Sequence, residues 1–395
     1  MKECYKIKIE PLTAVHIGTG ERLLPIDYVL KAPENSERTN YVKFSSERII
    51  DSILKSGSLK QKQELQRVSD ENNINSLASF FQKYFYLGID YDSRITNGFL
   101  NLHSQKIKSG LFENSLAVNQ MLHHGAKPYI PGSSIKGAVR TAILNKALSD
   151  LQIDEYNDLQ EMADNEKNKD FKKSGNYENR IQAKALSMLK VQGIDSAKLD
   201  PFRCIEITDC EFSVKNQIVG QMENLKIDSA KKELYSESMQ MIVEAITGKL
   251  ADGKAVSDFI IRINKDLQNI ELNNGFCINK KIDINEIISA CNFFFKTQFS
   301  KEYKKFYQDA YEGVDTIVEL KKIIDAIPDD SENEFLLRIG HWSQVEFVTL
   351  EENFRNPKTP VRKGKVMPYG TSRTVLNYNG QYLPMGWCKC TVEKE

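Results

Sequence analysis

One stretch constrains the fold of this chain more than any other, residues 129–144, which read YIPGSSIKGAVRTAIL. An extended apolar dipeptide leads into a proline and a glycine, and a helical pattern follows. A serine oxygen can accept one of the unpaired amides in the first turn of a helix, so Ser133 or Ser134 is the predicted N-cap. Gly132 and Gly137 allow another backbone or a phosphate to come close. The stretch therefore predicts a junction between a strand and a helix.

This junction also has the chemistry of an anion site. Free amides at the start of a helix, the helix dipole and the ammonium of Lys136 would meet at one place. Lys136 and Arg140 are four residues apart, so they share one face of the helix. The stretch is not a P-loop, because no Ser or Thr follows the lysine as GxxxxGK[ST] requires. A phosphate-binding helix and an ordinary connection both remain open.

Charge is segregated along the chain. With 54 basic and 54 acidic residues the net charge is zero, which argues against nucleic-acid binding by the chain as a whole. Residues 114–149 and 355–374, however, contain no acidic residue and several lysines and arginines. The distribution predicts local basic surfaces on a protein that is neutral overall.

Composition indicates a protein without a membrane span, a metal or a cofactor. No apolar run approaches the ~20 residues that cross a bilayer, and the alternating N-terminus has no signal-peptide pattern. A cytoplasmic location is therefore expected. The seven cysteines are scattered without a CxxC pair, so reduced thiols are expected in place of a zinc site.

Three motifs together resemble one family. PGSSIKGAVRTA resembles the signature helix of the RAMP superfamily of CRISPR-associated proteins. LTAVHIGTGE, residues 12–21, resembles the first RAMP strand and its glycine loop. GTSRTVLNYNGQYLPMGWCKC, residues 370–390, resembles the G-x-[TS]-R segment and the closing P-x-GW strand. The order of the motifs resembles the Csm group of type III-A systems, and within it the large RAMP subunit at the crRNA 3′ end.

Strands separated by long helical stretches predict an α+β fold. The resemblance narrows this to tandem ferredoxin-like (RRM-like) domains, residues 1–235 and 236–395, with helical insertions at about 45–90, 150–200 and 255–327. Apolar side chains at helical spacing, including Ile287, Cys291 and Phe294, are expected in the core, as is Trp387 in the closing strand. The predicted strands are 5–10, 24–30, 41–44, 99–108, 115–123, 202–215, 239–247, 334–340, 344–350, 371–378 and 383–392. The predicted helices are 45–56, 58–86 with an interruption around Asn72 and Asn73, 256–267, 284–308 and 316–327.

Two residues are candidates for catalysis, and neither has an evident partner. His16, beside Gly18 and Gly20, is either a general base or RNA contact, or a histidine that braces the turn. In the related backbone subunit of the resembled family, an aspartate in a matching segment promotes metal-dependent cleavage of target RNA. Asp27 could hold a hydrated Mg²⁺ in this way, or it could cap the hairpin. No second carboxylate follows at an obvious spacing, so no catalytic residue is assigned.

The C-terminal block is the better candidate for binding RNA. Gly370 frees the backbone beside Arg373, and Lys363 and Lys365 could follow a phosphate backbone. Tyr369 and Tyr378 could stack on bases. Trp342, in IGHWSQ, follows a glycine and is expected to be the more accessible of the two tryptophans. The alternative is a solvated basic loop. The expected RNA-binding residues are His16, Gly18, Gly20, Ser133, Ser134, Lys136, Gly137, Arg140, Trp342, Lys363, Lys365, Gly370, Thr371 and Arg373.

The resemblance implies a non-catalytic crRNA-binding subunit of the type III-A Csm complex. Such a subunit would cap the backbone at the crRNA 3′ end and be needed for crRNA maturation in antiviral defence. Expected partners are crRNA, target RNA, neighbouring Csm backbone subunits and a recruited nuclease that trims the 3′ end. Two alternatives remain open, a metal-dependent ribonuclease of the superfamily and a RAMP subunit at another position in the complex.

Overall fold

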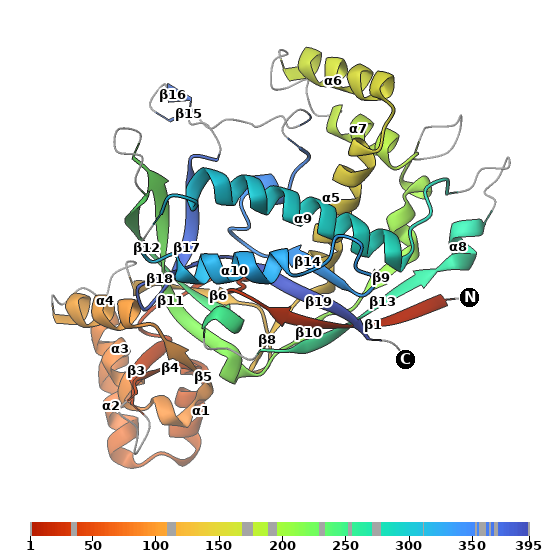
Figure 1. Ribbon diagram of the computed structural model, residues 1–395. Coiled ribbons are helices and arrows are strands. Elements are labelled where there is room, and N and C mark those ends of the chain that lie inside the picture. The colour runs from red at the N-terminus through yellow and green to blue at the C-terminus, as the bar shows by residue number, and fades with distance from the viewer. Residues whose placement is uncertain are drawn as a thin grey trace.

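Two large β-sheets and a layer of helices make up the protein (Figure 1). The computed structural model describes residues 2–32, 38–108, 116–167, 177–188, 196–228, 234–251, 255–270, 278–310, 312–351, 354, 361–362, 365–366 and 370–393. Within this part of the chain no helix is long and apolar enough to cross a membrane. The prediction of an α+β fold is confirmed.

The first sheet has five antiparallel strands in the order β14-β19-β1-β13-β9. Along the chain, helix α5 follows β1 and helix α9 follows β13, so β1-α5-β9-β13-α9-β19 has the connectivity of a ferredoxin-like unit. The bounds are β1 Lys2–Pro11, α5 Gly132–Ser149, β9 Ile205–Ile207, β13 Ser257–Asn264, α9 Ile284–Phe306, β14 Glu334–Arg338 and β19 Trp387–Glu393.

The second sheet has nine strands, seven of them in the order β2-β6-β12-β11-β5-β4-β3, and β17 and β18 extend it from β11. Strands from both sides of residue 235, the predicted domain boundary, are interleaved in each of the two sheets. The bounds are β2 Gly18–Leu23, β3 Tyr28–Lys31, β4 Asn40–Phe44, β5 Ile89–Ile95, β6 Val118–Met121, β11 Gln217–Ile227, β12 Leu234–Ile246, β17 Ser372–Tyr378 and β18 Gln381–Pro384.

Two smaller sheets are separate from the two large ones, and the chain has further helices. Strand β8 (Lys127–Ile130) pairs with β7 (His123–His124) and β10 (Cys210–Glu211), and β15 (Val361–Arg362) pairs with β16 (Lys365–Val366). These helices include α4 Asn97–Lys108, α6 Ile153–Lys167, α7 Tyr177–Ala185, α8 Lys265–Asn269 and α10 Asp315–Asp325.

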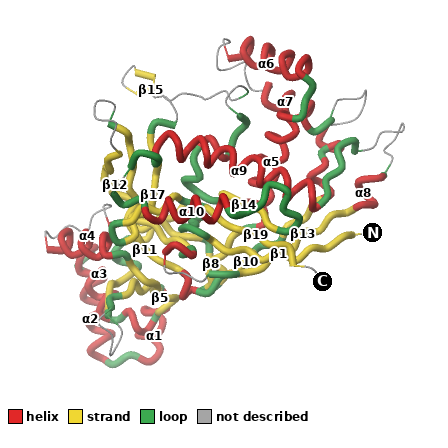
Figure 2. Tube along the Cα trace, in the orientation of Figure 1, coloured by secondary structure: helices red, strands yellow, loops and turns green. Residues whose placement is uncertain are grey.

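Helices α1 (Ser46–Ser56), α2 (Leu59–Asp70) and α3 (Ile74–Lys83) form a lobe at one end of the molecule (Figure 2). Each begins with a side-chain cap, from Ser45, Ser58 and Asn73 respectively. The helices have a hydrophobic cluster of their own, built from Phe44, Ile49, Ile53, Leu65, Val68, Phe80, Phe81 and Tyr84. The predicted helical insertion after residue 45 and its interruption near residue 72 are therefore confirmed.

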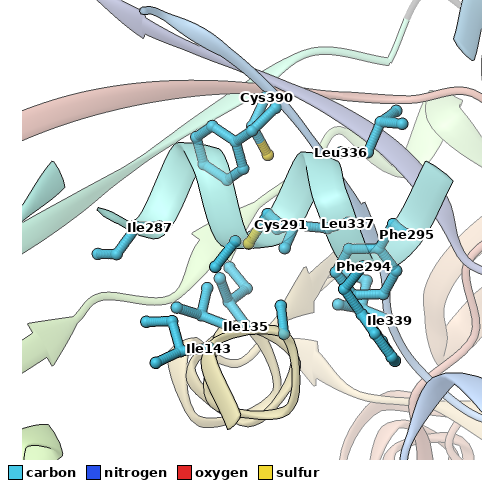
Figure 3. Packing of buried hydrophobic residues seen from close by; sticks show 14 of the residues in the cluster. Ile135, Ile143, Ile287, Cys291, Phe294, Phe295, Leu336, Leu337, Ile339 and Cys390 are labelled. Carbon is cyan, nitrogen blue, oxygen red and sulfur yellow. The ribbon is translucent and has the colours of Figure 1, made fainter. Parts of the chain in front are cut away.

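The main core lies between helices α5 and α9 and the five-stranded sheet (Figure 3). Ile287, Cys291 and Phe294 of α9 are buried there, as predicted from their helical spacing. Trp387 is fully buried, with Phe299 and Phe347 packed edge-on at 5.2 and 5.4 Å between ring centroids. The six described cysteines are free thiols, in agreement with the sequence.

Several sequence predictions of secondary structure are wrong, among them the single strand 383–392, which is divided between β18 and β19 in different sheets. Residues 99–108 belong to helix α4 and residues 344–350 contain a 3₁₀ turn, η7 (Val345–Phe347), where strands were predicted. Residues 202–215 are broken into the turn η4 (Pro201–Cys204) and two short strands. Residues 257–264 form the strand β13 in place of a predicted helix, because β13 lies between β1 and β9 and buries every second residue.

Candidate nucleic-acid interface

Strand β8 leads directly into helix α5, as the sequence predicts, but the helix begins differently. Pro131 is the N-cap and makes no side-chain hydrogen bond, so the predicted capping by Ser133 or Ser134 is wrong. The first amide of the helix, at Gly132, donates to Oδ1 of Asp209 at 2.7 Å. A carboxylate of the protein itself therefore accepts the amide that a bound anion could have taken, one of the two possibilities left open by the sequence.

The two cations of this helix also have partners within the fold. Nζ of Lys136 donates to the carbonyl of Ile205 at 2.7 Å, and Nη1 of Arg140 lies 2.9 Å from the carboxylate of Asp200. They share a face, as predicted, and that face packs against the segment leading into β9. Gly137 is exposed, and a Cβ there would meet nothing within 4 Å. A phosphate contact by Lys136 or Arg140 would require these contacts to be given up.

His16, before the glycine loop, is buried and braces the junction between the two sheets. Its Nδ1 donates to the carbonyl of Glu244 on β12 at 2.5 Å, and burial lowers the pKa of His16 to about 4, so the ring is neutral near pH 7. A Cβ on Gly18 would lie 2.8 Å from Nε2 of His16, so this glycine makes room for the ring. Gly20 is exposed, with a φ of +88°.

Asp27 closes the turn before β3. Its Oδ2 accepts the amide of Leu24 at 2.8 Å, while its own amide donates to the carbonyl of Leu24 at 2.8 Å. Burial raises the pKa of this carboxyl group. Among the residues that the structure describes, no three His, Cys, Asp or Glu side chains are grouped so that they could hold a metal ion. The geometry is that of a hairpin cap, one of the two interpretations open from the sequence.

Arg373 of the C-terminal block points into the protein. Its side chain is 3% exposed, its Nε lies 2.6 Å from Oε1 of Glu302, and its Nη2 lies 3.1 Å from Oε1 of Glu346. The guanidinium also lies 4.0 Å from the ring centroid of Phe306. Burial alone would lower the pKa of Arg373, but the carboxylates of Glu302 and Glu346 outweigh it and raise that pKa. A phosphate contact by Arg373 would require this arrangement to break.

The remaining residues of the block fall into two groups. Lys363 lies outside the described residues, and Lys365 lies in the short strand β16. Gly370 and Thr371, just before β17, line a pocket of about 480 Å³ together with Trp342. The full lining is Gly340, His341, Trp342, Ser343, Gln344, Val345, Val348, Gly370, Thr371, Ser372 and Thr374.

This pocket brings together segments that are far apart in the sequence. The ring of Trp342 lies against His16, with 5.1 Å between centroids, and against His341, with 4.2 Å. His16, Trp342, Gly370 and Thr371 are thus gathered in one region, whereas the predicted residues of α5 are not among those that line it. We call this region the Trp342 pocket. Its polar residues Ser372 and Thr374 were missed in the sequence, although their alternate spacing on a strand places them on one face.

Comparison with known proteins agrees with this fold. The family model of the RAMP superfamily matches residues 8–351. The chain is 24% identical over 441 aligned residues to the CRISPR system Cms protein Csm5 of Methanocaldococcus jannaschii, covering 98% of this chain and 88% of that protein.

Two solved structures have the same fold over nearly the whole chain. One is a chain of the Csm–crRNA–target RNA ternary complex of a type III-A CRISPR–Cas system, with a TM-score of 0.64, 18% identity, and 99% of this chain and 100% of that chain covered. The other is T. onnurineus Csm5, with a TM-score of 0.57, 17% identity, and 96% and 99% covered. Since the family model spans most of the sequence and the fold agrees from end to end, the chain belongs to the RAMP superfamily.

Proposed function

We propose that this chain is an RNA-binding and assembly subunit of a type III-A Csm effector complex, located at the 3′ end of the crRNA. The observation that carries the proposal is the agreement in fold over 99% of the chain with a protein solved in a Csm–crRNA–target RNA complex. The Trp342 pocket supports it, because an aromatic ring and a glycine-containing loop meet there on the surface.

In this proposal the subunit cleaves no RNA. Asp27 is engaged by the amide of Leu24, and a lone carboxylate is a poor holder of Mg²⁺ at a phosphodiester. His16 is 3% exposed, so a ribose hydroxyl at the surface could not reach the Nε2 lone pair that a general base would use. Both observations favour a binding role over a ribonuclease.

The proposed partners follow from the position in the complex. The subunit would bind crRNA and target RNA, contact the neighbouring backbone subunit, and end the row of such subunits in the cytoplasm. A nuclease that trims the 3′ end of the crRNA would be recruited next to it. Loss of the subunit would then leave the 3′ end of the crRNA without a fixed limit.

Reconstitution of the complex with and without this chain tests the proposal. We expect complexes that lack it to carry crRNA with longer and heterogeneous 3′ ends, and ultraviolet crosslinking to join this chain to the 3′ part of the guide. Crosslinks confined to the 5′ handle would instead assign it to the other end of the complex. Cleavage of bound RNA by the isolated chain in Mg²⁺, abolished by Asp27→Ala, would support the ribonuclease alternative.

A further inference from the structure

We propose that the Trp342 pocket takes one unstacked nucleobase of the guide RNA, stacked on the indole of Trp342. The inference rests on the proposed function and names the part of the RNA that this site recognises. It assigns a neutral, flat group to the pocket, beside Arg373, for which the sequence suggested a phosphate contact.

The first observation is the charge of the pocket wall. Among its described lining residues there is no Lys, Arg, Asp or Glu, and His341 is the one side chain that could become charged. Phosphate recognition depends on cations or on convergent amides, whereas a base offers a π-face and neutral hydrogen-bonding edges. The wall provides an indole, an apolar side chain at Val348, and the amide and hydroxyl groups of Gln344 and Ser372.

The second observation explains why the wall is uncharged. Arg373 lies between the lining residues Ser372 and Thr374 on β17, where successive side chains point to opposite faces. The guanidinium of Arg373 therefore turns away from the pocket and pairs with Glu302 and Glu346 inside the protein. Arg373, which the sequence suggested as an RNA ligand, therefore lies on the opposite face of β17 from the pocket.

The third observation is the indole ring of Trp342, on which the base would stack. Trp342 is partly exposed, and it rests on the buried ring of His16, whose Nδ1 is held by the carbonyl of Glu244. A ring supported in this way loses little freedom when a base stacks on its open side. The volume of about 480 Å³ lies within the range of ~300–1,000 Å³ that small-molecule pockets have.

The fourth observation is the backbone that presents the ring. Gly340, Trp342 and Gln344 have φ angles of +92°, +62° and +69°, and the last two are unusual for residues with side chains. The loop is held in this form by the amide of His341, which donates to the carbonyl of His16 at 2.8 Å, and by Oγ of Ser343, which donates to the carbonyl of Gly340 at 2.6 Å. Strain that is kept in place at a pocket is typical of a pre-organised binding site.

The test uses the full chain and single-stranded RNA with the sequence of the 3′ part of the guide, in which an abasic nucleotide is moved one position at a time. We expect one position at which the abasic nucleotide weakens binding by about tenfold or more, since stacking of one base on an aromatic ring is worth that much. Trp342→Ala should weaken binding to the intact RNA by the same factor and should abolish the effect of the abasic nucleotide.

Two variants serve as controls. Trp342→Phe keeps a stacking surface and should retain most of the affinity. Phe293→Ala removes an aromatic side chain that is 44% exposed on α9, away from the pocket, and should bind like the unaltered chain. The salt dependence of binding should be the same for all variants, because no phosphate contact changes.

A measurement on the unaltered chain does not depend on whether a variant folds. Of the two tryptophans, Trp387 is fully buried, so changes in tryptophan fluorescence on adding RNA report on Trp342. We expect quenching by the intact RNA and much weaker quenching when the critical base is absent. RNA that binds tightly with no base-dependent quenching, and with equal affinity at every abasic position, would overturn the base pocket. Failure of the chain and of its complex to bind guide RNA at all would instead overturn the proposed function.

Discussion

Glu302 of α9 holds Arg373 of β17 in a fully buried ion pair, with 2.6 Å between Oε1 and Nε. The other oxygen of Glu302 lies 2.9 Å from Nη1 of Arg338 on β14. Strand β14 belongs to the five-stranded sheet and β17 to the nine-stranded sheet, so one carboxylate on one helix links both sheets. Breaking a buried pair is costly because it leaves an uncompensated charge away from water.

We therefore expect Arg373→Ala to lower the free energy of unfolding by about 3–5 kcal/mol. Urea denaturation measures this loss, with Arg140→Ala as the control. The Arg140–Asp200 pair is partly exposed, at 26% and 22%, so its loss should cost only about 1 kcal/mol. A stable Arg373→Ala variant whose RNA affinity has a salt slope reduced by about one unit would show that Arg373 contacts phosphate instead.

Lys136 and Arg140 give a second prediction, for the double change of both residues to Gln. Because their partners, the carbonyl of Ile205 and the carboxylate of Asp200, lie within the fold, we expect a loss of about 1–3 kcal/mol in unfolding free energy. The salt slope of RNA binding should not change. A slope reduced by about two units in a stably folded double variant would restore the phosphate-binding face predicted from the sequence.

His16 should make stability depend on pH. Its folded pKa, about 4, is below the ordinary value of 6.5, so the unfolded chain binds a proton more readily. The stabilisation from the neutral ring is complete above pH 6.5 and is lost as the pH falls toward 4. From pH 7 to pH 5 the free energy of unfolding should fall by about 2 kcal/mol more for the unaltered chain than for His16→Asn. The amide of the asparagine can still donate a hydrogen bond, so this variant is the matched control. Equal losses would mean that His16 titrates normally.

Asp27→Asn tests whether the hairpin cap has a catalytic role. We expect a loss of about 1 kcal/mol in unfolding free energy, because the amide of Leu24 keeps an acceptor that is no longer charged. Target-RNA cleavage by the assembled complex should be unchanged at every site when products are compared on a gel in Mg²⁺. Disappearance of one specific product, with assembly preserved, would make Asp27 part of a nuclease site.

Gly370→Ala and Gly137→Ala form a matched pair. Gly370 has a φ of +70°, and its Cβ would lie 2.5 Å from Oε1 of Glu346, so the change should cost about 1–2 kcal/mol and disturb the Trp342 pocket. Gly137 lies in a helix with open space beside it, so alanine should stabilise the chain by about 0.5–1 kcal/mol. Thermal melting with RNA binding measures both. Weaker RNA binding by the more stable Gly137→Ala variant would reveal a close approach of RNA to α5.

Local patterns predicted those elements whose stability is local. The lobe of α1 to α3 was predicted because its apolar residues recur at helical spacing within a few turns. Helix α9 was predicted for the same reason, from a stripe that includes Ile287 and Phe294. Strand β13 was predicted as a helix, because its apolar side chains suit either period and only its pairing with β1 and β9 decides between them.

Some features of the candidate site could be predicted from the sequence, and others depend on long-range packing. The glycines, the aromatic residue Trp342 and the family motifs mark the region around the pocket in the sequence itself. The direction of Arg373 does not follow from its neighbours, because it depends on Glu302, which is 71 residues away and reaches it only through the packing of α9 on β17.

The family, the α+β class and the lobe of α1 to α3 could be predicted from the sequence, because motifs and helical or strand periodicity are short-range patterns. Which charged and polar groups are paired inside the protein depends on contacts between distant segments. Asp209 takes the amide of Gly132, and Glu302 takes the guanidinium of Arg373, through contacts that only long-range pairing of strands and helices creates. A buried charge must find a partner wherever the fold brings one, and that requirement placed the predicted phosphate ligand inside the protein.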